Sequence, residues 1–114
     1  MVDFNYRKLP LQGGSPREVA SVVNLIMDGK VNSTGTFTLT TSATSTTVTD
    51  FRAGTNSVIL LMPTTANASA EIGAGTIFIS ARVDNSFTIT HASNSQSDRT
   101  FGYSVIGWIY YPYP

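Results

Sequence analysis

The stretch Thr36-Phe37-Thr38-Leu39-Thr40 alternates threonine with a large apolar residue at every second position. Successive side chains of a β-strand point to opposite faces of the sheet, so this period of two predicts a strand with Phe37 and Leu39 facing a core. Threonine is β-branched and is favoured in strands of this half-buried kind. The stretch therefore predicts an antiparallel sheet with one apolar face and one hydroxyl-bearing face.

Similar short segments recur from Asn32 onward and predict further strands at Thr46–Thr49, Ser57–Met62, Thr76–Arg82, Ser86–His91 and Phe101–Gly107. Ser57–Met62 is apolar on both faces, which predicts a central strand that is covered on both sides. The Ala-, Thr-, Asn- and Gly-rich segment Thr64–Gly75 is expected to form a loop, and Val83–Asn85 a tight turn. Together these segments predict a mainly β fold, with a small antiparallel β-sandwich or jelly-roll-like body at residues 32–107.

Residues 1–31 have a different composition, because half of the charged side chains lie in the first 30 residues and no lysine follows Lys30. Ser15-Pro16-Arg17-Glu18 has the N-cap, the first-turn proline and the acidic residue of a capping box. Four apolar residues then fall on one face of a short α-helix: Val19, Val22, Val23 and Ile26. A helix of about twelve residues is marginal alone in water. We therefore expect an N-terminal anchoring arm whose apolar face is buried on the body of the chain or on a neighbouring subunit.

Residues 108–114 form an aromatic C-terminal tail, Trp108-Ile109-Tyr110-Tyr111-Pro112-Tyr113-Pro114. So apolar a segment is rarely left free in water. We expect Trp108, Tyr110 and Tyr111 to be trapped at an interface between subunits. Stacking of these rings on the sugars of a receptor glycan is the alternative.

Composition excludes several classes of protein. The 114 residues suffice for one compact domain, and the seven Lys and Arg balance the seven Asp and Glu, so bulk attraction to nucleic acid is not expected. The chain has no cysteine, which excludes disulfides, thiolate metal sites and a cysteine nucleophile. Neither a signal peptide nor a membrane-spanning run is recognisable, so no membrane partner and a cytosolic site of synthesis are expected. Serine and threonine make up 29 of the 114 residues, which predicts a surface solubilised by hydroxyl groups.

The chain offers few groups for catalysis, and we expect no enzymatic activity, no metal and no cofactor. His91 is the only histidine, no G-x-S-x-G motif occurs, and His91 continues the Phe87 and Ile89 face of its strand. It is interpreted as a packed residue of the strand or as one at the rim of the sheet. A polysaccharide hydrolase is the enzymatic alternative and would need a carboxylate pair, formed by Glu71 with Asp84 or Asp98.

Opposite charges lie close together at three places in the body. The pairs are Asp50 with Arg52, Arg82 with Asp84, and Asp98 with Arg99. Residues i and i+2 of a strand share a face, so the first two of these pairs are predicted to form local ion pairs. Asp98 and Arg99 are adjacent, and they are included as a structural polar pair. Fixing the register of subunits at an interface is the alternative role.

Six segments resemble a family of small virion structural proteins of tailed bacteriophages: Asn5–Pro10, Val22–Lys30, Thr47–Arg52, Asn56–Ala68, Ile89–Ala92 and Asp98–Phe101. The resemblance covers nearly the whole chain and ends near Ile106-Gly107, before the aromatic tail. It implies a trimeric β knob whose N-terminal arm attaches it to the tail or fibre of a virion assembled in the bacterial cytoplasm. Other virion proteins of the tail, the portal region or the capsid would be its partners. No catalytic residue comes with the pattern, which contributes Asp50, Arg52, Asp98 and Arg99 as polar pairs and His91 as a strand residue.

Two alternatives to a tail or fibre protein remain open at this point. A capsid decoration or cement protein would use the same arm and knob on the phage head. A receptor module would bind a host surface glycan through Trp108, Tyr110, Tyr111 and Tyr113.

Overall fold

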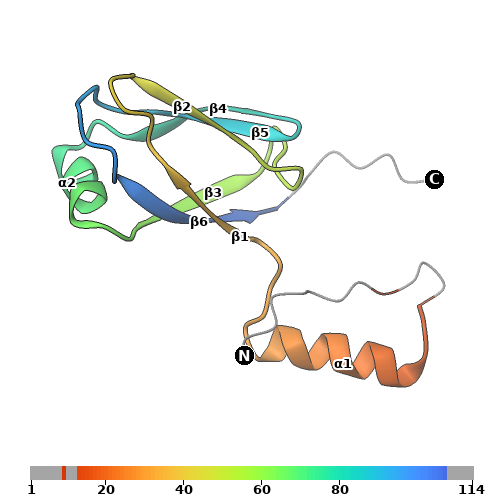
Figure 1. Ribbon diagram of the computed structural model, residues 1–114. Helices are drawn as coiled ribbons and strands as arrows, with labels where there is room; N and C mark the ends of the chain where they lie inside the picture. The colour runs from red at the N-terminus through yellow and green to blue at the C-terminus, as the bar shows by residue number, and fades with distance from the viewer. Residues whose placement is uncertain (1–8, 10–12, 108–114) are drawn as a thin grey trace. The chain divides into compact units, whose positions relative to one another are not determined.

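The computed structural model describes Leu9 and residues 13–107. The chain divides into two compact units, Met1–Asn32 and Ser33–Pro114. In chain order, the described part contains α1 (Pro16–Met27), β1 (Thr34–Thr38), β2 (Ser45–Thr49), β3 (Val58–Pro63), α2 (Ala66–Ala74), β4 (Phe78–Val83), β5 (Ser86–Thr90) and β6 (Thr100–Ile106), as Figure 1 shows. The mainly β class predicted from the sequence is confirmed.

Helix α1 of the first unit begins with the capping box that the sequence predicts. The Glu18 backbone N–H donates to Ser15 Oγ, and the Ser15 backbone N–H donates to Glu18 Oε1, each at 3.1 Å. Pro16 occupies the first helical turn, where a missing N–H costs nothing. The helix ends at the C-cap Asp28, and Gly29 follows with a φ of +80° that favours glycine. Local sequence alone therefore accounts for both ends of α1.

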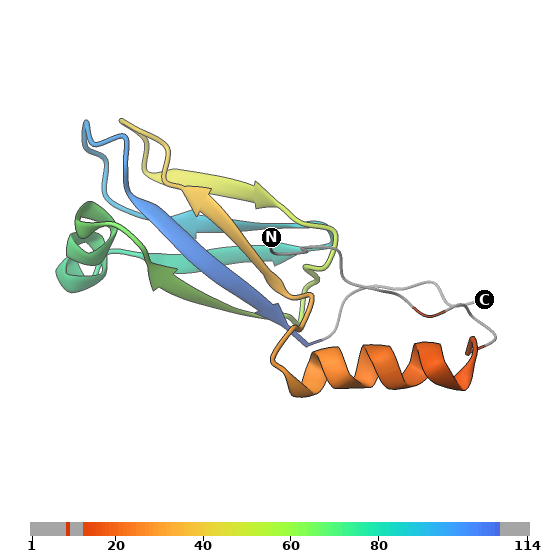
Figure 2. The ribbon, with the colours of Figure 1, turned by 60° about the horizontal axis from the view of Figure 1, so that its bottom comes forward.

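The second unit is a small β-sandwich-like body of two three-stranded antiparallel sheets. One sheet has the order β1-β6-β3 and the other the order β2-β5-β4, and Figures 1 and 2 show them as two layers with α2 at one end. β4 and β5 form a hairpin through Asp84 and Asn85, with Asn85 at a φ of +74°. Asparagine tolerates this left-handed conformation better than most residues do.

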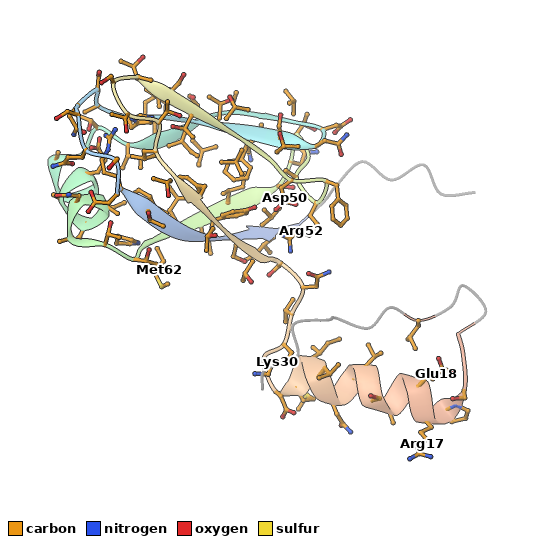
Figure 3. The ribbon with its side chains drawn as sticks, viewed as in Figure 1. Arg17, Glu18, Lys30, Asp50, Arg52 and Met62 are labelled. Atoms are coloured by element: carbon orange, nitrogen blue, oxygen red, sulfur yellow. The ribbon has the colours of Figure 1, made fainter. Side chains whose placement is uncertain are left out.

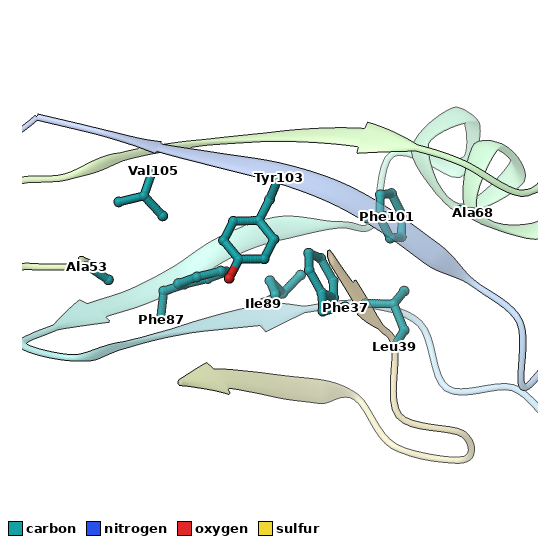
Figure 4. Close-up of a cluster of buried hydrophobic side chains, with 9 residues drawn as sticks. All are labelled: Phe37, Leu39, Ala53, Ala68, Phe87, Ile89, Phe101, Tyr103 and Val105. Carbon is teal, nitrogen blue, oxygen red and sulfur yellow. The ribbon is translucent and has the colours of Figure 1, made fainter. Parts of the chain in front are cut away.

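The core lies between the two sheets and is built around stacked aromatic rings (Figure 4). Phe37 stacks on Phe101 with ring centroids 5.4 Å apart, and Phe87 meets Tyr103 edge to face at 5.2 Å. Leu39, Ala53, Ala68, Ile89 and Val105 complete the buried cluster. The alternation of buried and exposed residues that the sequence predicts for Phe37 and Leu39 is therefore present.

The prediction that Ser57–Met62 forms a central strand is wrong. β6 takes the central place, and among the described residues β3 is an edge strand that pairs with β6 alone. Ile59 and Leu61 pack against the core, whereas Val58, Leu60 and Met62 on the other face are 53%, 54% and 62% exposed. Pro63 closes the strand and has no backbone N–H, which suits an edge position.

The prediction that Thr64–Gly75 is a loop is also wrong, because it contains helix α2. The Thr65 hydroxyl accepts from the Ala68 N–H at 3.1 Å, and Gly75 ends the helix in the left-handed conformation at φ +76°. Only Ala68 and Glu71 of this helix are buried. So short a helix with two buried residues shows little apolar periodicity, but its two caps are visible in the sequence.

The outward faces of both sheets carry hydroxyl groups that pair across strands. The hydroxyl oxygens lie 2.9 to 3.1 Å apart in three pairs: Thr38 with Thr100, Thr47 with Thr88, and Ser33 with Ser104. Such pairs contribute up to about 1 kcal/mol each in antiparallel sheets. The abundance of serine and threonine thus has a structural use as well as a solubilising one.

Candidate functional site

The apolar face of α1 is exposed in the first unit. Val19, Val23 and Ile26 are 37%, 49% and 55% exposed, and no residue of the helix is buried. Val22, between them on the same face, is half-buried. These four are the residues predicted to anchor the chain or to bind a neighbouring subunit. The other three predicted interface residues, Trp108, Tyr110 and Tyr111, lie outside the described residues.

Asp50 and Arg52 form an ion pair at the turn after β2. Arg52 Nη2 lies 2.7 Å from Asp50 Oδ2, and Arg52 Nε donates to Asp50 Oδ1 at 2.9 Å. Tyr103 of the central strand donates its hydroxyl to Asp50 Oδ2 at 2.6 Å, and Arg52 Nη2 donates to the backbone oxygen of Thr34 at 3.0 Å. The pair, labelled in Figure 3, therefore ties the turn after β2 to two strands of the opposite sheet.

This contact changes the pKa of all three side chains in it, and it raises that of Arg52 through the hydrogen bond to Asp50. The hydrogen bond from Arg52 lowers the pKa of Asp50 to about 2, with a further contribution from Tyr103, although burial of the carboxyl acts in the opposite direction. Burial raises the pKa of Tyr103 to about 12, and its hydrogen bond to the ionised Asp50 acts in the same direction. The favoured state is thus an ionised carboxylate beside a neutral phenol, which suits a structural contact.

Arg99 does not pair with the neighbouring Asp98, contrary to the prediction. Its side chain is fully buried, and Nη1 donates to Glu71 Oε1 of α2 at 3.1 Å. The same guanidinium donates to the backbone oxygens of Ala92 at 2.8 Å and Thr40 at 3.2 Å. Asp98 instead accepts from Asn67 Nδ2 at 2.6 Å. Adjacent residues of an extended chain point apart, so Arg99 faces the interior and Asp98 the surface.

Glu71 is held on both oxygens by groups from different parts of the body. Oε1 accepts from Arg99, and Oε2 accepts from the Thr76 hydroxyl and the Ala92 N–H, both at 2.9 Å. Burial tends to raise the pKa of Glu71, but the hydrogen bonds from Ala92, Thr76 and Arg99 outweigh it and hold the pKa below its usual range. A hydrolase would need a carboxyl group that can hold a proton near neutral pH. The pairing of Glu71 with Arg99 disfavours that role.

Arg82 and Asp84 do not form the predicted ion pair. Asp84 lies in the hairpin turn beyond the end of β4, so the rule that residues i and i+2 share a face fails between them. Arg82 is opposite Phe87 in the register of the hairpin, and its Nη1 donates to the backbone oxygen of Ser57 at 2.6 Å. Arg82 thus links the edge strand β4 to the start of the other sheet's edge strand, β3.

His91 is a buried residue with both ring nitrogens in contact with polar groups. Nδ1 lies 2.9 Å from the backbone oxygen of Ala92, and Nε2 lies 2.8 Å from Thr46 Oγ1. A carbonyl oxygen only accepts, so Nδ1 carries the hydrogen in that bond. The ring joins β2 to the segment after β5.

A shallow apolar trough of about 250 Å³ lies on the outer face of the β1-β6-β3 sheet. Its floor is the central strand at Gly102 and Ser104, and its side is formed by Leu60 and Met62 of β3, with Thr34 of β1 opposite. Figure 3 shows Met62 projecting from the sheet. The sequence did not predict this surface, because Ser57–Met62 was expected to be covered on both sides. Pro63, at the end of the apolar run, is the sequence signal for an edge strand.

Leu9 and residues 13–107 hold no cluster of three or more His, Asp or Glu side chains that could bind a metal ion. No helix in this part of the chain is long and apolar enough to cross a membrane. Comparison with protein-family models, with curated proteins and with solved structures finds no match to this chain.

Proposed function

We propose that this chain is a non-enzymatic structural protein of a tailed-bacteriophage virion. Its N-terminal unit anchors a β-sandwich knob to the particle, and three copies associate. The observation that supports this proposal is the contrast between the two units. Helix α1 is well capped but buries no residue, whereas the unit Ser33–Pro114 contains a buried aromatic core. A helix of this length gains most of its stability by packing its apolar face, so it needs a partner.

The contacts of the charged side chains support a structural role for the body. Glu71 is neutralised by Arg99, and Asp50 is held by Arg52 and Tyr103. His91 bridges two backbone segments. Each of these groups would lose a stabilising contact if it took part in proton transfer.

The assignment to a phage virion rests on the resemblance of six sequence segments. Three of these segments contain residues with a visible role in the fold. Val22–Lys30 spans the second half of α1 and its end, and Thr47–Arg52 contains the ion pair after β2. Asp98–Phe101 contains the buried Arg99 and the core residue Phe101. The resemblance therefore falls on residues that define the fold.

The first test is the mass of the chain in solution, measured by light scattering. We expect three times the 12.2 kDa mass of the chain. A variant with Val19→Ser, Val23→Ser and Ile26→Ser should lose this association, while circular dichroism shows an intact β body. The matched control is Arg17→Ser with Asn24→Ser, on the opposite face of the same helix, and it should remain associated. A monomeric wild-type chain at all concentrations would contradict the trimer.

The second test locates the protein. Antibodies against the β body, applied to intact particles from a host lysate, should label the tail or fibre in electron micrographs. Labelling of the head would instead support the decoration-protein alternative. Absence of the chain from purified particles, measured by mass spectrometry, would contradict the virion assignment.

A further inference from the structure

The edge strand β3 has an outer side, away from β6, and the register of its sheet shows which backbone groups lie along it (Figure 2). The Thr64 N–H donates to the Thr100 backbone oxygen at 3.0 Å, and β3 pairs with β6 in the same register. Opposite residues of an antiparallel pair alternate between hydrogen-bonded and non-hydrogen-bonded. The alternation therefore turns the N–H and C=O groups of Ile59 and Leu61 away from β6, to the outer side of the strand.

Two other contacts agree with this assignment. Val105, which is opposite Ile59, donates its N–H to the Ser33 oxygen on the β1 side of the sheet, at 2.8 Å. Arg82 Nη1 donates to the backbone oxygen of Ser57, which has the same parity in the chain as Ile59. The outer side of β3 is thus a hydrogen-bonding edge, and among Leu9 and residues 13–107 no other strand pairs with it.

The outer face of the same strand is apolar. Val58, Leu60 and Met62 are each more than half exposed, and β3 carries no charged residue. The register of β3 with β6 is unbroken from Val58 to Pro63, so no bulge distorts this edge. An exposed apolar edge strand without a charge or a bulge is a site for pairing with another strand.

The other edges of the body have features that hinder such pairing. β4 is interrupted by a bulge between Ile79 and Ala81, and it carries the charged Arg82. On β1 the backbone oxygen of Thr34 already accepts from Arg52. The exposed side chains of β2 are all serine and threonine, so apolar contacts do not favour association there. β3 is therefore the edge on which strand addition is most favourable.

The strand β3 is complementary to a second copy of itself. When two copies lie antiparallel about a two-fold axis at Leu60, Ile59 of each copy is opposite Leu61 of the other. Both N–H groups and both C=O groups of these two residues then find partners across the axis. A shifted register brings in Pro63, which has no N–H, or Ser57, whose N–H already donates to the Gly54 oxygen. The pairing about Leu60 thus satisfies every outward group of Ile59 and Leu61.

The side chains match in the same register. Leu60 is opposite Leu60 of the second copy, and Val58 is opposite Met62. These are the non-hydrogen-bonded positions, where opposite Cα atoms approach most closely, at about 4.5 Å. The side chains of the two copies form one apolar row in which no like charges oppose each other.

We propose that β3 pairs antiparallel with β3 of a second copy and forms a continuous sheet of order β1-β6-β3-β3-β6-β1. This contact goes beyond the proposed function, because it involves the β body, whereas the proposed trimer contact involves α1. A single pair of short strands buries less than the roughly 800 Å² per partner of a standard stable interface. The pair therefore dissociates on dilution and leaves the mass of the dilute wild-type chain unchanged.

The first test is made in the variant with Val19→Ser, Val23→Ser and Ile26→Ser, so that the mass reports on the body alone. Its mass by light scattering should rise with concentration from 12.2 kDa toward twice that value. Leu60→Lys, added to this variant, opposes two like charges across the axis and should hold the mass at that of one chain. Thr36→Lys, at an exposed position of the other edge strand of the same sheet, is the matched control and should still pair.

The second test examines the register by disulfide cross-linking. The chain has no cysteine, so an introduced cysteine is the only thiol. Leu60→Cys in the otherwise wild-type chain should form a disulfide-linked dimer on mild oxidation, seen on a non-reducing gel. Met62→Cys, on the same face of the same strand, is the matched control. Its two copies lie about 14 Å apart along the strands, beyond the reach of a disulfide. Val58→Cys mixed with Met62→Cys should form the mixed dimer.

Three results would overturn the proposal. The first is a triple-serine variant whose mass stays at one chain at every concentration. The second is a Leu60→Lys variant that pairs as well as the Thr36→Lys control. The third is equal cross-linking of Leu60→Cys and Met62→Cys in chains that circular dichroism shows to be folded. A wild-type mass that never exceeds two chains would contradict the trimer and support the β3 pair, so the two failures are distinguishable.

Discussion

Gly35 of β1 lies against the ring of Tyr103 of β6, and the two residues are partners in the register of the sheet. A Cβ at position 35 would lie 2.6 Å from Tyr103 Oη and 2.7 Å from Cζ, which is closer than real contacts allow. The missing side chain lets the phenol lie over β1 and reach Asp50. One glycine thus permits the hydrogen bond that joins the central strand to the turn after β2.

Gly35→Ala should destabilise the body, because the new methyl group must displace the Tyr103 ring or the backbone. We expect a loss of about 1–3 kcal/mol in the free energy of unfolding, measured by urea denaturation. Gly102→Ala is the matched control on the neighbouring strand, since a Cβ there meets Met62 Cε at an ordinary 3.5 Å. Equal losses for the two variants would contradict the close approach of Gly35 and Tyr103.

Asp50 should make the stability of the body sensitive to acid. Its folded-state pKa of about 2 is below the ordinary 3.8, so its contribution is complete above about pH 4 and is lost as the pH falls through about 2. We expect this contribution to be about 2 kcal/mol. Asp50→Asn should be less stable at pH 7 and should lose less stability between pH 4 and pH 2.

Glu71 contributes to the acid sensitivity in both the wild type and Asp50→Asn, because its pKa is also lowered. The comparison therefore rests on the difference between their unfolding free energies at each pH. Asp84→Asn, at an exposed turn position, serves as control and should stay within about 0.5 kcal/mol of the wild type at pH 7. A parallel pH profile for Asp50→Asn and the wild type would show that Asp50 is not responsible.

Tyr103 should ionise late in an alkaline titration. Its pKa rises from 10.0 to about 12 on folding, so its contribution to stability is complete below about pH 10 and is lost as the pH rises through about 12. The measurement is the ultraviolet absorbance of phenolate in the wild type minus that in Tyr103→Phe. The missing step should centre near pH 12, and a step near pH 10 in the folded chain would refute the buried hydrogen bond to Asp50.

Glu71 and Arg99 should show strong coupling in a double-mutant cycle. Replacing Arg99 by Met leaves Glu71 buried without its charged partner, and we expect a loss of about 3–5 kcal/mol in the free energy of unfolding. Glu71→Met alone should lower the free energy of unfolding by a similar amount, because it leaves the fully buried guanidinium of Arg99 without its charged partner. The double variant should lose clearly less than the sum of the two single variants. Additive losses would mean that the two side chains do not act as a pair.

Much of the fold was predictable because it depends on local periodicity. The alternation around Phe37 and Leu39 and the capping box at Ser15 and Glu18 each report a structure formed by neighbouring residues. The six strands and α1 were accordingly found close to their actual positions. Helix α2 was missed because only Ala68 and Glu71 face the core, so its apolar periodicity is weak.

The polar contacts were harder to predict because their partners are distant in the chain. Asp50 and Arg52 are close in sequence and do pair, but Tyr103 joins them from 53 residues away. Arg99 pairs with Glu71, which is 28 residues away, and not with its neighbour Asp98. The position of β3 at an edge likewise depends on the strand order β1-β6-β3, and Pro63 is the local residue in the sequence that indicates it.

The cross-strand hydroxyl pairs on the two outer faces have a consequence for the conditions under which the body can work. The hydroxyls of Thr38, Thr100, Thr47 and Thr88 are neutral at every pH that the fold survives, and salt does not screen a bond between uncharged groups. Acid and alkali act instead on Asp50, Glu71 and Tyr103, which are buried. These threonine pairs therefore present the same donors and acceptors on the outer faces in dilute buffer and in concentrated salt.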